Sequence, residues 1–134
     1  MVQPFSLDPS MLSMIGNTFY PTGYSLVMFP DGADANTTGD RLSSEMPESN
    51  VFLLEPSTIL REITPTVSDA DNPLPSAGTE GATVRAYTKL ALDGHHGLLV
   101  ETPDAESAER MMQTVRQVPY SMAQRYRALV IEDL

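Results

Sequence analysis

The sequence predicts a single α+β domain in which an antiparallel or mixed sheet is covered by one or two helices. Three observations support this prediction. The chain has 134 residues, the usual length of one domain. Residues 104–118 carry apolar side chains at helical spacing, and the short runs 24–29 and 51–54 are almost continuously apolar, as buried strands are. We therefore expect residues 1–134 to form one domain.

The amphipathic helix over residues 104–118 is the clearest expected element. Its apolar side chains recur three and four positions apart, at Ala105, Ala108, Met111, Met112, Val115 and Val118. The preceding Thr102-Pro103-Asp104 offers a capping side chain and a first-turn proline, and Pro119 ends the helix. Because surface ion pairs stabilise a helix only slightly, we expect the alanine and methionine stripe to pack against the sheet.

Five strand-like runs form the expected sheet. Residues 24–29 and 51–54 are each followed closely by a proline. Residues 84–92 mix alternating apolar positions with β-branched and aromatic side chains, and they predict a β-hairpin that returns over residues 98–100. For the final segment we favour a strand over residues 128–131, with a helix as the alternative.

The remaining segments carry weaker signals. Residues 33–46 contain poor helix formers, so we expect at most a short helix over residues 41–46. Another short helix is expected after Asp8-Pro9-Ser10, with Gly16 at its end. Residues 64–83 are rich in Pro and Gly and predict a flexible loop. The resulting order approximates the ferredoxin-like βαββαβ arrangement.

Composition and charge limit the classes of partner. Eight basic and eighteen acidic residues give a formal net charge of −10, which repels nucleic acid and anionic lipid and favours a basic protein partner. The chain has no cysteine, so disulfides and thiolate metal sites are excluded. No run is long enough to cross a membrane, and the N-terminal residues do not resemble a secretory signal. We expect a cytoplasmic protein.

The candidate ligand-binding residues are His95, His96, Arg125 and Arg127. The two histidines are the only ones in the chain, and each can change its charge near neutral pH. They are adjacent, however, so in an extended segment they point to opposite faces and are poorly placed to grip one ion. Arg125 and Arg127 are expected to pair with acidic neighbours or to hold a small anion. We expect no metal and no cofactor, because no motif for either is present.

Three functional hypotheses follow. The leading one is a non-enzymatic acidic interaction module that binds a basic protein partner, because the charge is strongly negative and no catalytic motif is found. The second is a small-ligand-binding regulatory domain, with a homodimer as an alternative state. It predicts an apolar pocket edged by arginine. The third is an enzyme that uses His95 or His96 as an acid or base.

Overall fold

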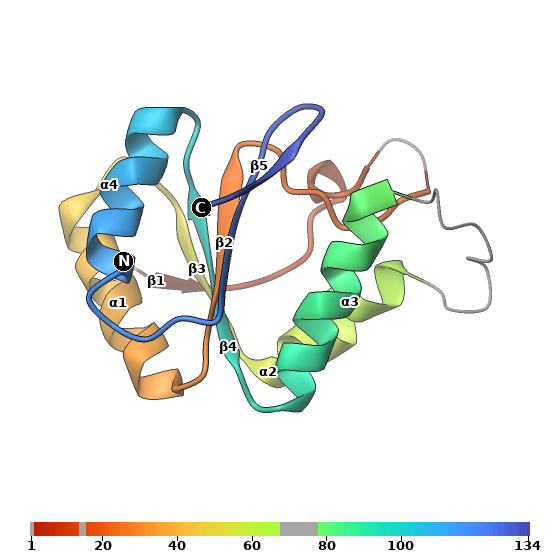
Figure 1. Ribbon diagram of the computed structural model, residues 1–134, viewed down its shortest axis with the longest axis horizontal. Coiled ribbons are helices and arrows are strands. Elements are labelled where there is room, and N and C mark those ends of the chain that lie inside the picture. The colour runs from red at the N-terminus through yellow and green to blue at the C-terminus, as the bar shows by residue number, and fades with distance from the viewer. Residues whose placement is uncertain (1, 14–15, 68–77) are drawn as a thin grey trace.

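A six-stranded mixed sheet forms the centre of the computed structural model, which describes residues 2–13, 16–67 and 78–134 (Figure 1). The strands are β1 (Val2–Pro4), β2 (Tyr24–Phe29), β3 (Val51–Leu54), β4 (His96–Glu101), β5 (Met122–Tyr126) and β6 (Ile131–Asp133). The helical segments are η1 (Pro9–Met11), α1 (Gly32–Glu45), α2 (Pro56–Thr58), η2 (Ile59–Ile63), η3 (Thr64–Thr66), α3 (Gly78–Leu92) and α4 (Ala105–Val115). The predicted single α+β domain is confirmed.

The strand order in the sheet is β1-β3-β4-β2-β5-β6. Only β1 and β3 are parallel neighbours, and every other neighbouring pair is antiparallel. Since β4 lies antiparallel between β2 and β3, the strands β1, β2 and β3 all run in one direction. Their carboxyl ends therefore meet at one end of the sheet.

Helices lie on both faces of the sheet. Figure 1 shows α1 and α4 on one face and α3 on the other. Strand β2 serves both cores, because Leu26 and Met28 join the core beneath α3 while Val27 and Phe29 join the core beneath α1 and α4. All four side chains are fully buried. The near-continuous apolar run of this strand is thus explained by two covered faces.

Helix α4 confirms the predicted amphipathic helix and the packing of its apolar stripe. Ala108, Met111, Met112 and Val115 are buried against the sheet. The cap differs in detail from the expectation: Asp104 accepts a hydrogen bond from the backbone N–H of Ser107 in a capping box. Thr102 is instead buried, and its hydroxyl pairs with that of Ser25 at 2.7 Å.

Helix α1 is longer than the sequence predicts. It covers residues that are poor helix formers, but its buried positions Ala35, Thr38, Gly39 and Leu42 recur at helical spacing. A Cβ atom on Gly39 would lie 3.1 Å from Leu98 Cδ2. Small side chains on this face therefore allow the helix to approach the sheet closely, and the packing outweighs the weak propensity.

The predicted hairpin over residues 84–100 is wrong in its first half. Residues 84–92 belong to helix α3, in which Val84, Tyr87 and Ala91 are buried at helical spacing while Arg85 and Lys89 are exposed. The apparent alternation was thus a helical stripe mistaken for a strand. A helical segment separates β3 from β4, so the ferredoxin-like βαββαβ order is not confirmed. In the described part of the chain, three long helices (α1, α3 and α4) are present where one or two were expected.

The two ends of the chain also differ from the predictions. At the C-terminus, residues 128–131 are not a buried strand. Ala128, Leu129 and Val130 form the exposed tip of a hairpin between β5 and β6. Near the N-terminus the expected helix is only a 3-10 turn, capped by the Asp8 side chain.

The predicted loop over residues 64–83 is wrong at both of its ends. Its first residues form the 3-10 turn η3, and α3 already begins at Gly78. Residues 68–77 lie outside the described part of the chain, as do residues 14–15 of the expected N-terminal helix.

Candidate functional site

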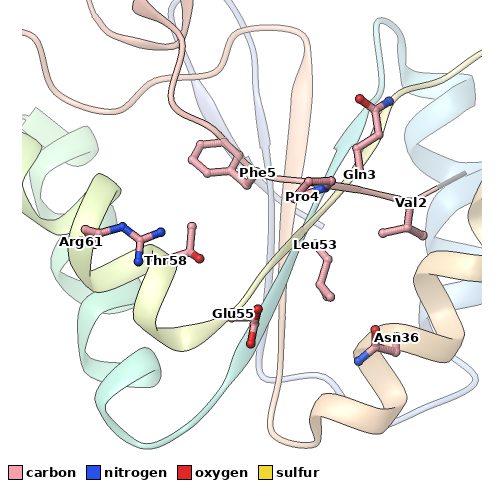
Figure 2. A pocket seen from close by; sticks show the side chains of 9 residues that line it. All are labelled: Val2, Gln3, Pro4, Phe5, Asn36, Leu53, Glu55, Thr58 and Arg61. Atoms are coloured by element: carbon pink, nitrogen blue, oxygen red, sulfur yellow. The ribbon is translucent and has the colours of Figure 1, made fainter.

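A concavity lies where β1 and β3 end, and we call it the β1 pocket (Figure 2). It has a volume of about 480 Å³, which falls within the range of small-molecule sites. Its lining residues are Val2, Gln3, Pro4, Phe5, Asn36, Leu53, Glu55, Thr58 and Arg61. Ligands of open α/β sheets commonly bind beyond the carboxyl ends of the strands, which is where this pocket lies.

The polar groups of the β1 pocket come from different elements. Glu55 follows β3 directly and precedes α2, while Thr58 and Arg61 lie on the following helical turns and Asn36 lies on α1. Figure 2 shows the side chains of Arg61 and Asn36 directed toward the hollow from helices on its two sides, with Glu55 between them. The apolar wall includes Leu53.

The carboxylate of Glu55 is exposed and makes no ion pair or side-chain hydrogen bond within residues 2–13, 16–67 and 78–134. Arg61 makes a loose pair with Glu62, at 3.4 Å, and 66% of its side chain is exposed. One Nδ2–H group of Asn36 donates to the Gly32 carbonyl, which leaves Oδ1 and the second Nδ2–H group for a ligand. The pocket thus presents a carboxylate and a guanidinium above an apolar wall.

A second, smaller concavity lies between α4 and the β5–β6 hairpin. We call it the arginine groove, and its volume is about 240 Å³. Its lining residues are Ala105, Ala108, Glu109, Met112, Arg116, Arg125, Glu132 and Leu134. Each arginine has a carboxylate partner: Arg116 pairs with Glu109 at 2.9 Å and Arg125 with Glu132 at 3.4 Å.

Of the predicted ligand-binding residues, Arg125 alone lines a described concavity. Its side chain is only 12% exposed, and its buried Nε has no hydrogen-bond partner in the described part of the chain. Arg127 lies beyond the end of β5 on the exposed hairpin and lines neither the β1 pocket nor the arginine groove. The structure therefore does not bring the two arginines into one site.

The two histidines lie where α3 turns into β4, and they make separate contacts. His95 Nδ1 is hydrogen-bonded to Ser121 Oγ at 2.9 Å, and Ser121 donates its proton to the Met28 carbonyl. Because the Ser121 hydroxyl donates to Met28, its oxygen accepts the hydrogen bond from His95 Nδ1. Neither imidazole lines the β1 pocket or the arginine groove.

The ring of His96 packs on the backbone at the start of α1. A Cβ atom on Gly32 would lie only 2.7 Å from His96 Cε1, so a larger residue at this position would displace the His96 ring. The buried Nδ1 of His96 has no hydrogen-bond partner among the described residues. Within the same residues, no three His, Asp or Glu side chains gather closely enough to hold a metal ion.

Sequence reasoning missed the residues of the β1 pocket because each is an ordinary polar residue without a motif. One signal was present. Glu55 directly follows a buried apolar run and precedes Pro56, a residue suited to the first turn of a helix. That pattern marks the end of a strand and the start of a helix, where side chains meet at the edge of a sheet.

Comparison with protein-family models, curated proteins and solved structures finds no match for this chain. Within the described residues, no helix is both long enough and apolar enough to span a bilayer.

Proposed function

We propose that this domain binds a small zwitterionic ligand, such as an amino acid or a short peptide, in the β1 pocket. The observation that carries the proposal is the convergence of Glu55 and Arg61 on one cavity of about 480 Å³. The guanidinium of Arg61 suits a carboxylate, and the carboxylate of Glu55 suits an ammonium group. The pocket also has the arginine edge that the small-ligand hypothesis requires.

Exposure of these charged groups supports binding. Within the described chain, the Glu55 carboxylate makes no ion pair or hydrogen bond that a ligand would have to break. The ion pair between Arg61 and Glu62 is long and exposed to solvent. Such a pair contributes little to stability, so a ligand can displace it at small cost. A hydrogen bond to a charged group contributes about 1.5–3 kcal/mol, which corresponds to roughly a ten- to hundredfold change in affinity.

The experiment is a titration of the protein with a panel of amino acids and dipeptides, followed by backbone NMR. At least one compound should shift the amide signals of Glu55 and Arg61. Arg61→Gln should weaken its binding about tenfold or more, but should leave binding of the corresponding decarboxylated amine unchanged. Glu55→Gln should weaken binding of both compounds.

Matched controls are Arg127→Gln and Glu106→Gln, which remove the same charges from exposed positions outside the β1 pocket. Neither control should change the affinity by more than about twofold, because exposed charges at a distance are screened by salt. The proposal is wrong if no compound shifts the pocket signals, or if both pocket variants bind as tightly as the unaltered protein.

The acidic interaction module is a second candidate function. It is supported by the net charge of −10 and by the hairpin between β5 and β6, where Leu129 is 94% exposed and Val130 is 52% exposed. Apolar side chains held at an exposed turn suit a protein partner. This function is compatible with ligand binding at the β1 pocket, because the two surfaces lie at opposite edges of the sheet.

A further inference from the structure

The two edges of the sheet are protected in different ways. Strand β1 carries Pro4, which has no N–H to offer another strand. Strand β6, at the opposite edge, contains no proline. Among residues 2–13, 16–67 and 78–134, this edge is protected by its short length and by the charges of Glu132 and Asp133. The β6 edge therefore excludes strands of like charge, but its backbone is able to pair.

The outward-facing backbone groups of β6 can be assigned from its register. Val130 exchanges hydrogen bonds with Arg127, and the N–H of Leu134 donates to the Ala123 carbonyl. Because such pairs alternate along an antiparallel ladder, Val130, Glu132 and Leu134 face β5. Ile131 and Asp133 accordingly direct their N–H and C=O groups outward, so the edge offers two donors and two acceptors.

Successive side chains of β6 point to opposite faces of the sheet. Leu134 packs with the core beneath α1 and α4, and Glu132 lines the arginine groove on that face. Ile131 packs with the core beneath α3. The groove beside the edge has apolar walls from Ala105, Ala108, Met112 and Leu134. Its volume of about 240 Å³ can receive an apolar side chain from an added strand.

The charge at this edge favours a cationic strand. The positive charges of Arg125 and Arg116 are offset by Glu132 and Glu109. Exposed Asp133 and Arg127 add one charge of each sign, and Asp104, which interacts electrostatically with Arg125, adds a further carboxylate, so a net negative charge remains at this edge. Two copies of β6 would bring like charges together, which disfavours pairing with a second copy of this chain. The net charge of −10 attracts a basic segment at long range.

We infer that the outer edge of β6 is a docking site for an extended, basic segment of another protein, which joins the sheet as an additional strand. The inference rests on the second candidate function and names its surface and the chemistry of its partner. Backbone hydrogen bonds to Ile131 and Asp133 provide affinity. Lysine or arginine side chains of the segment approach the acidic edge, and an apolar side chain enters the arginine groove.

The probe for the experiment is a soluble peptide of four Lys-Val repeats, compared with a Glu-Val peptide of equal length. The Lys-Val peptide should bind at least tenfold more tightly at low salt, and amide hydrogen exchange should slow at Ile131 and Asp133. A Lys-Val peptide with N-methyl groups on alternate residues keeps its charge but loses donors. It should bind at least tenfold more weakly than its parent.

The variant Ile131→Pro removes one outward-facing donor without changing the charge, and Ile131→Val is its matched control. Proline should abolish the slowed exchange at Asp133, whereas valine should preserve it. If Ile131→Pro fails to fold, the N-methylated peptide still decides the outcome. The assignment of the β6 edge is wrong if the N-methylated peptide binds as tightly as its parent, or if amide exchange slows at residues outside β6. Either result would leave the acidic interaction module as a valid proposal. If no Lys-Val peptide binds, the acidic interaction module itself is wrong.

Discussion

The contact between Gly32 and His96 shows how one residue couples two elements. The imidazole occupies the space that a side chain at Gly32 would need, with ring atoms 2.7–3.0 Å from the ideal Cβ position. Gly32 is the first residue of α1, and His96 is the first residue of β4. The start of this helix is therefore matched in shape to the ring at the start of the strand.

Gly32→Ala should destabilise the protein by about 1–3 kcal/mol, because an added methyl group in a filled space forces its neighbours to move. In a His96→Ala background the same change should be neutral or stabilising, since alanine is a better helix former than glycine. Urea unfolding of the four proteins measures both effects. Equal costs of Gly32→Ala in the two backgrounds would show that the ring does not fill this space.

At the level of elements, the methionine face of α4 attaches this helix to the sheet. Met111 and Met112 are 0% and 1% exposed, whereas Gln113 on the same helix is exposed. Together with the capping box at its start, this face explains why α4 was the element best predicted from the sequence. The residues that recur at helical spacing in the sequence are the same residues that pack against the sheet.

Met111→Ala should lower the free energy of unfolding by about 2–5 kcal/mol, because it removes a buried side chain and leaves a cavity. Gln113→Ala should change stability by less than about 0.5 kcal/mol. Thermal and urea unfolding, monitored by circular dichroism, provide the comparison. Similar losses for both variants would contradict the packing of α4 described here.

Predictability from the sequence differed among the elements for physical reasons. Strands β2 and β3 were predicted within their observed bounds, because both contribute side chains to the cores on the two faces of the sheet and therefore leave a nearly continuous apolar run. Helix α1 was underestimated because close packing at Gly39 selects residues of low helical propensity. Helix α3 was missed because Val84 and Tyr87 suit a strand equally well by composition.

The candidate site was less predictable than the fold. Arg125 was selected from the scarcity of basic residues, and it does line a groove. The β1 pocket depends instead on β1 and β3 lying side by side, a pairing between residues about fifty positions apart in the chain. The position of Glu55 before Pro56 indicates the end of a strand, but neither Glu55 nor Arg61 indicates that β1 lies beside β3. Only the assembled sheet brings them to one cavity.

Viewed as a whole molecule, the protein consists of three layers, and a pair of buried tyrosines connects the α3 layer to the sheet. The hydroxyl of Tyr87 on α3 donates to Gln124 Oε1 at 3.1 Å and lies 3.1 Å from the hydroxyl of Tyr126 on β5. Burial raises the pKa of Tyr87 well above its ordinary value, and the neighbouring Tyr126 adds to this shift.

This raised pKa predicts that the protein loses stability in alkali. Below the ordinary tyrosine pKa of about 10, Tyr87 is neutral in both states and its contribution is complete. Above that pH the unfolded chain releases the Tyr87 proton while the folded chain retains it, so stability falls as pH rises.

Tyr87→Phe should make the alkaline decline in stability less steep, at a cost near neutral pH of about 0.5–1.5 kcal/mol. Urea unfolding between pH 7 and about pH 11 tests this, with Tyr120→Phe as the matched control outside the cluster. An unchanged slope in Tyr87→Phe would show that this residue does not control alkaline stability.

The strand order has a consequence for how the chain folds during synthesis. Strand β2 lies between β4 and β5 in the sheet, yet both of these neighbours follow it by about seventy residues or more. A nascent chain that ends before His96 consequently contains β2 without either hydrogen-bonded neighbour. Strand β2 must remain exposed, or be shielded by a chaperone, until residues 96–126 leave the ribosome.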